Sequence, residues 1–494
     1  MLARGGNAVD AALAAAIALV VVEPTGNGLG SDAFAILWDG RALHGLNASG
    51  RSPAAWTPER FPGGAMPERG WESVTVPGAV SAWVDLSARF GQLSFSALFE
   101  PAVTLAERGF HVSPVVAAIW RRAETVLARE PGFAEAFLPG GRAPAAGELF
   151  VNKPLAASLR AIAETRGEAF YRGALAERIA AFARKHGAAL TVDDLADHRN
   201  DWCGTIAKAF GEVALHEIPP NGQGIAACMA LGILRHVGLT GHEPDSVEAL
   251  HLEIEAMKLA FRDVMAYVGD ASAMTEVTPA HLLDDGYLAS RAKLIDSDRA
   301  QDFGSGAPRF GGTVYLAAAD ESGMMVSYIQ SNYFGFGSGV VVPGTGISLQ
   351  NRGFGFVTAK GHPNRVGPRK RPFHTIIPGF LMKGSEPLMS FGVMGGPMQA
   401  QGHLQMTLRT QLWGQDPQTA ADAPRWRVLS GLAVAIEAQM PSEVREALAA
   451  RGHGISVEPP DAAFAFGGAQ LIHRIPGGYV AGSDPRKDGQ AVGF

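Results

Sequence analysis

Gly311-Gly312-Thr313-Val314-Tyr315-Leu316-Ala317-Ala318-Ala319 consists of two glycines followed directly by a predicted strand, near the middle of the chain. Asp320-Glu321-Ser322-Gly323 predicts a turn, and residues 324–331 predict a second strand. Thr313 therefore lies at the start of a predicted hairpin. Threonine is common in strands because it is β-branched, so this stretch alone does not indicate catalysis.

The composition is that of a globular protein with many tight turns. Of 494 residues, 47% are hydrophobic and 18% charged, which excludes a disordered chain, and the length allows one large fold or two layered halves. The 61 glycines and 31 prolines follow no period. A net charge of −6 without a basic run argues against nucleic acid and anionic membranes as partners.

Two further features limit the protein class. Only Cys203 and Cys228 are present, too few for a disulfide framework or a thiolate zinc site, although two cysteines leave a single bridge open. The apolar run from Ala11 to Val22 is too short to span a bilayer and ends at Glu23-Pro24, so we predict a buried helix. We expect a cytoplasmic protein, or a periplasmic one if a signal peptide was lost from a truncated N-terminus.

Hydrophobic patterning predicts a mixed helix and strand chain. A glycine loop at 24–32 could cradle a phosphate, but it lacks the last glycine of the dinucleotide fingerprint and leads into a strand, which argues against nucleotide binding. Residues 114–200 are predicted to be mostly helical, and residues 271–310 irregular. The other predicted helices are 7–22, 79–90, 95–109, 225–237, 247–267 and 398–412, and the other strands are 33–38, 41–46, 213–218, 375–381 and 388–393.

The helix at 247–267 contains His251, Glu253 and Glu255. This spacing differs from that of helical zinc proteases, so we predict a solvent-exposed face and no metal site.

Motifs of several enzyme classes are missing, which leaves Thr313 as the candidate nucleophile. There is no Gly-x-Ser-x-Gly, HExxH, Walker A or CxxC motif. If the Gly312–Thr313 bond were cut, the new α-amine of Thr313, with a reference pKa of about 7.7–8.0, could act as its base. Gly395-Gly396, after a predicted strand, could direct N–H groups at an oxyanion, or could form an ordinary turn.

Several motifs together resemble the γ-glutamyltransferase family of N-terminal-nucleophile hydrolases over nearly the full chain. They are, in order, Gly5-Gly6-Asn7-Ala8-Val9-Asp10-Ala11-Ala12, Val22-Glu23-Pro24, Gly28-Leu29-Gly30, Pro77-Gly78, Pro219-Pro220, Gly395-Gly396, Ala423-Pro424-Arg425 and Ser483-Asp484-Pro485-Arg486.

The resemblance implies an α/β fold, a four-layer α/β/β/α sandwich. It implies self-cleavage at Gly312–Thr313 into a large subunit, 1–312, and a small subunit, 313–494, which together form one structural domain. Thr313 would be the nucleophile and Gly395 and Gly396 the oxyanion hole, without a cofactor or metal. Ser331 falls where the family has a second hydroxyl near the nucleophile's amine.

The positions that bind the glutamyl group depart from the family pattern. Ser49 stands where the family has the carboxylate-binding arginine, and Gly355 where it has the acidic residue for the α-amine. Two serines near the carboxylate become His374 and Thr375. With these replacements the sequence resembles the transferase-like amidohydrolase branch of the family, which includes oxamate amidohydrolase and cephalosporin-acylase-like proteins. As substrate-binding residues we predict Arg51, Asn351, Arg352, His374 and Thr375, although Arg51 could be an ordinary surface arginine.

The resemblance implies a hydrolase of γ-glutamyl amides such as glutathione, with hydrolysis favoured over transfer. The alternatives are an enzyme for another carboxylate-bearing amide, of the oxamate amidohydrolase or cephalosporin acylase type, and a non-catalytic binding protein on the same fold. The expected partners are a small-molecule amide and the second subunit of a self-cleaved heterodimer, which could dimerise further.

Overall fold

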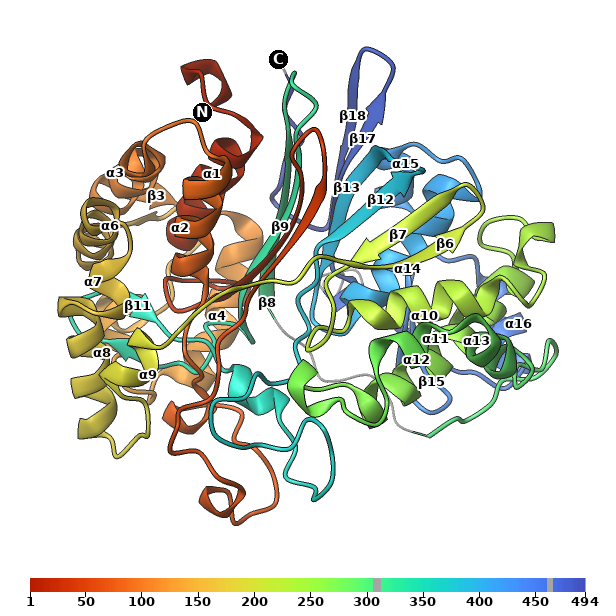
Figure 1. The fold of residues 1–494 in the computed structure, drawn as a ribbon, viewed down its shortest axis with the longest axis horizontal. Coiled ribbons are helices and arrows are strands. Elements are labelled where there is room, and N and C mark those ends of the chain that lie inside the picture. The colour runs from red at the N-terminus through yellow and green to blue at the C-terminus, as the bar shows by residue number, and fades with distance from the viewer. Residues whose placement is uncertain (305–311, 460–464, 494) are drawn as a thin grey trace. The chain divides into compact units, whose positions relative to one another are not determined.

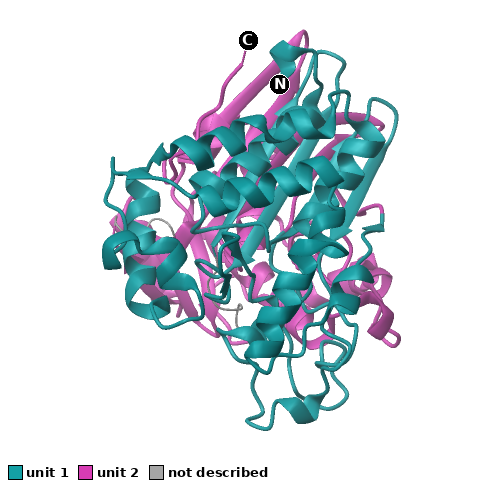
Figure 2. Ribbon diagram, turned by 90° about the vertical axis from the view of Figure 1, so that its left-hand side faces the viewer, with its two compact units in different colours: residues 1–203, 311–376 teal, residues 204–310, 377–494 magenta. Residues whose placement is uncertain are grey.

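A computed structural model describes residues 1–304, 312–459 and 465–493. The chain forms two compact units (Figure 2), one of residues 1–203 and 311–376 and the other of residues 204–310 and 377–494. We call them unit 1 and unit 2. Each unit contains segments from both sides of the Gly312–Thr313 bond, so each combines parts of both predicted subunits.

Unit 1 is built on a five-stranded sheet with the order β5-β2-β1-β9-β8, in which all pairings are antiparallel. The predicted hairpin is confirmed, since β8 and β9 pair across the turn at 320–323. The strands are β1 (Asp32–Trp38), β2 (Leu43–Ala48), β5 (Asp201–Trp202), β8 (Gly312–Ala319) and β9 (Met325–Tyr333), and two short pairs join β3 (Phe110–His111) to β4 (Leu149–Phe150) and β10 (Val341–Val342) to β11 (Ile347–Ser348).

Helices cover the sheet of unit 1 (Figure 1). The predicted first helix is confirmed: Asn7 and Asp10 cap each other's backbone N–H groups at its start, and the helix packs against β8 and β9. The predicted helical region 114–200 is also mostly helical. The helices are α1 (Ala8–Val22), α2 (Ala79–Phe90), α3 (Glu100–Arg108), α4 (Pro114–Leu127), α5 (Phe133–Phe137), α6 (Lys153–Thr165), α7 (Glu168–Tyr171), α8 (Ala174–Lys185) and α9 (Val192–Ala196).

Unit 2 has a six-stranded antiparallel sheet with the order β18-β17-β13-β12-β7-β6. The strand predicted at 375–381 begins only at Gly379, because Pro378 has no N–H for the ladder. The strands are β6 (Ile206–Phe210), β7 (Val213–Glu217), β12 (Gly379–Lys383), β13 (Glu386–Met394), β17 (Gly468–Ile475) and β18 (Gly478–Ser483), and a separate sheet contains β14 (Trp426–Ser430), β15 (Ala433–Glu437) and β16 (Gly454–Glu458).

In unit 2, α10 packs against β6 and β7, and α14 packs against β13. The described part of the region 271–310 is more regular than predicted, because Thr278 and Asp284 cap two short helices there. Residues 305–310 of that prediction lie outside the described residues. The helices are α10 (Gly224–Leu234), α11 (Val247–Tyr267), α12 (Pro279–Leu283), α13 (Asp285–Ala292), α14 (Met398–Gln411), α15 (Pro417–Asp422) and α16 (Ser442–Ala450). Within the described ranges of either unit, every helix is too short or too polar to cross a membrane.

Candidate active site

Thr313 lies at an irregularity in the β8–β9 hairpin of unit 1. Gly312 pairs with Tyr333 and Val314 with Gln330, and the register shifts between them, at Thr313. Such bulges redirect a side chain out of the regular alternation and are common beside active sites. The Thr313 side chain is buried, and its hydroxyl donates to Ser331 Oγ at 3.1 Å.

Ser331 connects Thr313 with the preceding peptide bond. Its hydroxyl donates to the carbonyl oxygen of Gly312 at 2.7 Å, and its oxygen also accepts from the backbone N–H of Tyr333 at 2.7 Å. The predicted nucleophile, the second hydroxyl and the carbonyl of the predicted cleavage bond thus form one hydrogen-bond chain.

The glycine loop before β1 packs tightly against other backbone. A Cβ on Gly26 would lie 3.4 Å from the backbone N and C atoms of Thr313. A Cβ on Gly30 would lie 2.3 Å from the carbonyl oxygen of Ser348, which is closer than real contacts allow. The glycines of this loop are therefore explained by close packing of backbone against backbone, and a bound phosphate is not needed to account for them.

Asp32, at the start of β1, lies next to Ser331 in the β1–β9 register and is fully buried. It accepts from His374 Nε2 at 3.0 Å and from the Gly50 N–H at 3.0 Å. Burial raises the pKa of Asp32 to about 7, although the positive charge of Arg352 pulls it down. Burial, together with Arg352, lowers the pKa of His374 well below its usual value, so His374 is neutral.

Arg352 is buried and keeps unused hydrogen-bonding capacity. Its guanidinium lies 4.4 Å from the ring centroid of Tyr333, and its Nη1 donates to Thr375 Oγ1 at 2.9 Å. Its Nε and Nη2 meet no acceptor among the residues that the structure describes. Burial lowers the pKa of Arg352 to about 10, which leaves it charged at neutral pH. A charged fork with two open donors suits a carboxylate.

The other predicted substrate-binding residues divide into two groups. Thr375 and His374 gather with Arg352 near Asp32, as described above. The side chain of Asn351 is hydrogen-bonded to backbone groups. Its oxygen accepts from the backbone N–H of Phe334 at 3.1 Å, and its amide nitrogen donates to the carbonyl of Glu68 at 2.8 Å. Arg51 is partly exposed and donates to the carbonyl of Arg199 and, at 3.5 Å, to Asp201.

The glycine pair of unit 2 lies between β13 and α14. Gly395 and Gly396 have φ of 131° and 61°, which favours glycine at both positions. Their carbonyls accept from the N–H groups of Met398 and Gln399, at 3.2 and 3.1 Å. Within the described ranges, neither glycine's own N–H has an acceptor, as an oxyanion hole requires.

Comparison with known proteins identifies the family. The family model described as Gamma-glutamyltranspeptidase matches residues 1–494. The chain belongs to the γ-glutamyltranspeptidase family. It is therefore an enzyme, an amidohydrolase of the γ-glutamyltransferase and glutathione hydrolase type.

Several members of this family are similar over almost the whole chain. The glutathione hydrolase-like YwrD proenzyme of Bacillus subtilis is 36% identical, and the oxamate amidohydrolase proenzyme of Klebsiella pneumoniae 34%, each over 100% of this chain and 95% of the relative. The crystal structure of cephalosporin acylase from Bacillus halodurans matches with a TM-score of 0.94 at 47% identity, over 99% of this chain and 92% of the other. The predicted fold class, that of the N-terminal-nucleophile hydrolases, is confirmed.

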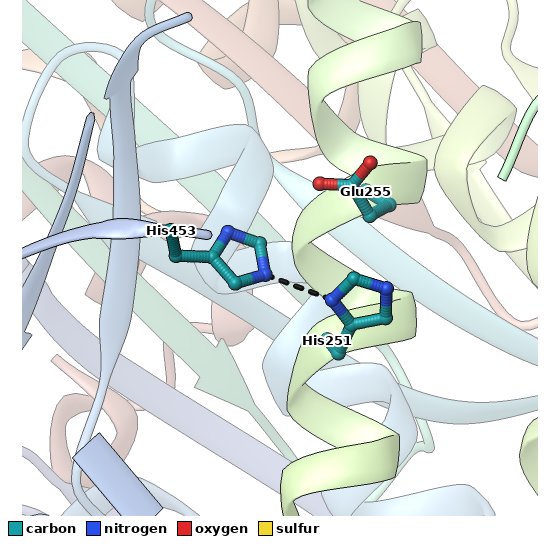
Figure 3. Close-up of side chains that lie close together, drawn as sticks. All are labelled: His251, Glu255 and His453. Atoms are coloured by element: carbon teal, nitrogen blue, oxygen red, sulfur yellow. Dashed lines mark hydrogen bonds between the residues drawn. The ribbon is translucent and has the colours of Figure 1, made fainter. Parts of the chain in front are cut away.

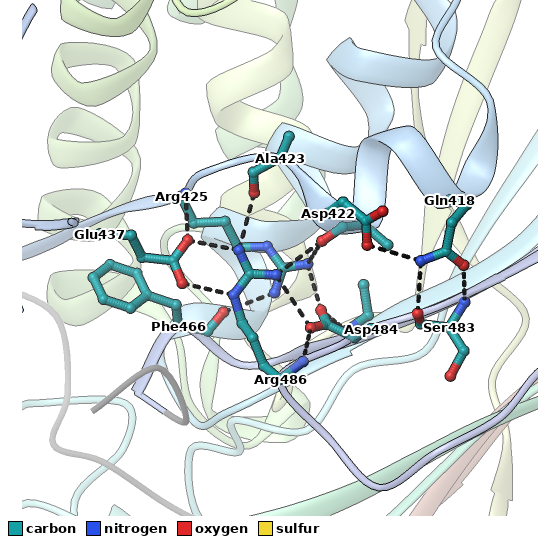
Figure 4. Close-up of polar contacts among 11 residues, drawn as sticks. Gln418, Asp422, Ala423, Arg425, Glu437, Phe466, Ser483, Asp484 and Arg486 are labelled. Carbon is teal, nitrogen blue, oxygen red and sulfur yellow. Dashed lines mark hydrogen bonds and ion pairs between the residues drawn. The ribbon is translucent and has the colours of Figure 1, made fainter. Parts of the chain in front are cut away.

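Two of the segments on which the sequence resemblance rests meet in a buried ion network of unit 2 (Figure 4). Arg425 donates to Asp484 at 2.6 Å and to the Phe466 carbonyl at 3.0 Å, and Arg486 donates to Glu437 at 2.6 Å. Phe466 precedes Gly467, which packs against Gly395, where an added Cβ would lie 3.0 Å from the Gly467 Cα atom. The network therefore fixes the chain behind the glycine pair.

The prediction of a solvent-exposed face at His251, Glu253 and Glu255 is wrong, because α11 packs against α10, α16 and β14 and all three residues are buried. His251, Glu255 and His453 lie together (Figure 3), with potential metal-ligand atoms within 4.8 Å of one another.

Hydrogen bonds account for this cluster without an ion. Lys258 Nζ donates to Glu255 at 2.7 Å and to His453 Nδ1 at 3.4 Å. His453 Nε2 then donates to His251 Nδ1 at 2.8 Å, and His251 Nε2 donates to the Asp296 carbonyl at 2.7 Å. A divalent cation would add two buried positive charges beside Lys258, with Glu255 already paired, so the arrangement favours a structural hydrogen-bond chain.

Sequence reasoning missed two residues near the site. Asp32 follows the glycine loop directly, and an acidic residue entering an otherwise apolar strand is the signal that could have identified it. Gln223, whose side chain donates to the Gly396 carbonyl, carried no such signal.

Proposed function

We propose that this enzyme is a self-processing amide hydrolase that cuts its own Gly312–Thr313 bond and then uses Thr313 as its nucleophile. The observation that supports this proposal best is the hydrogen-bond chain from Thr313 through Ser331 to the Gly312 carbonyl. The proenzyme names of its relatives agree with it.

In the proposed cleavage, Thr313 Oγ1 attacks the carbonyl carbon of Gly312. The Thr313 hydroxyl proton passes to Ser331 as the Ser331 proton moves toward the developing oxyanion. The C–N bond breaks, the nitrogen takes up a proton, and an ester joins Gly312 to the Thr313 side chain. Water then hydrolyses the ester, which frees the Gly312 carboxylate and the Thr313 hydroxyl and α-amine.

In turnover, the α-amine of Thr313 would take the proton of its own hydroxyl as the hydroxyl attacks the substrate amide. The N–H groups of Gly395 and Gly396 would stabilise the tetrahedral oxyanion. The amine product leaves with a proton, and water resolves the acyl-enzyme.

The preferred substrate is an amide whose acyl half carries a carboxylate but needs no α-amine. Arg352 supplies a buried cation with two donor nitrogens, Nε and Nη2, that meet no acceptor among the described residues. Gly355 has no carboxylate with which to bind a substrate α-amine. A Cβ at this position would lie 2.5 Å from the Phe373 carbonyl, so there is no room for a longer side chain. A carboxylate facing Arg352 would gain charge-assisted hydrogen bonds.

A γ-glutamyl amide such as glutathione is the second candidate. It too carries a carboxylate that Arg352 could bind, and the relative at 36% identity is named glutathione hydrolase-like.

Two chromogenic amides that differ only in the α-amine separate these candidates, glutaryl-p-nitroanilide and γ-glutamyl-p-nitroanilide. We expect kcat/KM to be at least about tenfold higher for the glutaryl compound, since an amine without a partner costs binding energy. Rates of hydrolysis of oxamate, acyl-cephalosporins and glutathione, measured side by side, then show which acyl group the enzyme prefers. Preference for the γ-glutamyl compound would reverse the assignment, and an uncut, inactive protein would refute the proposed function altogether.

A further inference from the structure

Gln223 connects the start of α10 with the glycine pair before α14. It is fully buried at the N-cap position of α10, and its Nε2 donates to the carbonyl oxygen of Gly396 at 2.8 Å. The same carbonyl accepts from the backbone N–H of Gln399 at 3.1 Å. Two donors from different elements therefore hold one carbonyl.

Gly396 needs such support because its backbone is intrinsically free. Its φ of 61° lies in the left-handed region, where glycine has no side chain to oppose rotation. Pro397 follows, so the Gly396–Pro397 peptide has no N–H with which to anchor itself. The Gly396 N–H lies in the preceding peptide plane together with the Gly395 carbonyl, which accepts from the Met398 N–H. Holding the Gly396 carbonyl restricts the φ and ψ angles of Gly396 and therefore the orientation of that plane.

A second buried contact fixes the segment that carries Gln223. Glu217, at the end of β7, pairs with His403 Nδ1 of α14 at 2.6 Å, and both side chains are fully buried. Gly224, next to Gln223, packs directly on Glu217, where an added Cβ would lie 2.6 Å from the carboxylate. Residues 217–224 are thus joined to residues 396–403, which include the start of α14, by the Glu217–His403 and Gln223–Gly396 contacts.

We infer that Gln223 is a positioning residue that fixes the Gly396 peptide so that the Gly395 and Gly396 N–H groups keep the orientation an oxyanion requires. The inference rests on the proposed role of this glycine pair. Because a misplaced donor weakens transition-state stabilisation more than substrate binding, loss of the Gln223 hydrogen bond reduces kcat and leaves KM nearly unchanged.

The test compares Gln223→Met with Gln405→Met. Methionine keeps the length of glutamine but cannot donate. Gln405 is an apt control because it is also buried, lies on α14 and donates to a backbone carbonyl, that of Trp426, at 3.0 Å. Both variants lose a buried hydrogen bond to a backbone carbonyl, so a general loss of stability would affect them alike.

We expect kcat of Gln223→Met to fall about 10- to 100-fold with KM within about threefold of wild type, and Gln405→Met to keep its kcat. Self-cleavage should persist in both, because Ser331 contacts the Gly312 carbonyl. If Gln223→Met does not fold, Gln223→Asn retains the amide one carbon short of Gly396 and should show the same loss. Equal kcat in the Gln223 and Gln405 variants would overturn this inference alone, whereas an uncut, inactive wild type would overturn the proposed function.

Discussion

The hydroxyl of Thr313 lies 3.1 Å from that of Ser331, and the register shift at the start of β8 brings this contact about. In a regular strand, neighbouring side chains alternate between the two faces of the sheet. Ser331 on β9 pairs with Asp32 on the neighbouring strand β1, so the hydroxyl pair lies next to a buried carboxyl group. The hairpin thus places the candidate nucleophile beside groups that can accept and donate protons.

The first prediction concerns self-cleavage. Thr313→Ala should remain one chain of 51.8 kDa, whereas Thr313→Ser, which keeps a hydroxyl, should be cut at the Gly312–Ser bond. Ser331→Ala removes the donor to the Gly312 carbonyl and should slow cleavage about 10²- to 10³-fold. A time course on denaturing gels, with intact-mass measurement of the fragments, checks all three. Cleavage of Thr313→Ala at residue 312 would contradict the assignment.

A second prediction tests Arg352 as the carboxylate-binding residue. Arg352→Lys keeps the charge but loses the planar fork, and should lower kcat/KM for glutaryl-p-nitroanilide about 10- to 100-fold. Butyryl-p-nitroanilide, which has no carboxylate, serves as the matched substrate and should be affected far less. Arg51→Lys is the matched enzyme control, since Arg51 already pairs with Asp201. Equal losses on both substrates would indicate that Arg352 maintains the fold.

Local patterns in the sequence predicted much of the fold. The Asn7 cap, the hairpin after Gly312 and α11 from Val247 to Tyr267 depend on near neighbours in the chain, and all were predicted closely. The burial of His251 could not be predicted in this way, because the elements that cover α11 come from distant parts of the sequence.

The same limit applies to the site. Thr313, Ser331 and the glycine pair could be named from the family resemblance. The surroundings of Arg352 depend on how Asp32, Tyr333 and Thr375 meet in space. These contacts join segments far apart in the chain, and no spacing in the sequence encodes them.

A third prediction follows from the burial of Asp32. Its pKa is about 7 in the folded protein and 3.8 without burial, so the folded state holds a proton that the unfolded chain releases. The stabilisation that comes from the raised pKa of Asp32 is complete below about pH 4 and is lost as the pH rises toward 7. Over this interval the free energy of unfolding falls by at most about 1.4 kcal/mol per pH unit. Asp32→Asn cannot titrate, so its stability relative to wild type should increase over this interval. Urea unfolding at pH 4.5, 5.5 and 6.5 measures the difference, and parallel curves would contradict the raised pKa.

The last prediction concerns acid sensitivity of the Lys258–His453–His251 chain. Burial, with Lys258 and His251 nearby, lowers the pKa of His453 to about 3 from 6.5, so His453 is neutral when folded. Its contribution to stability is complete above about pH 6.5 and is lost as the pH falls toward 3, since only the unfolded chain takes up the proton readily. His453→Gln should cost about 1 kcal/mol near pH 8 through the altered hydrogen bonds, and should lose less stability than wild type between pH 7 and 4.

His186→Gln, at an exposed position on α8's C-terminal cap, is the control for replacing a histidine as such. Chemical unfolding of wild type and both variants at pH 8, 7, 5.5 and 4.5 gives the comparison. If His453→Gln and His186→Gln lose stability in parallel with wild type at each acidic step, folding does not lower the pKa of His453, and the folded protein takes up that proton as readily as the unfolded chain. The assignment of this cluster as a hydrogen-bond chain with a neutral His453 would then be wrong.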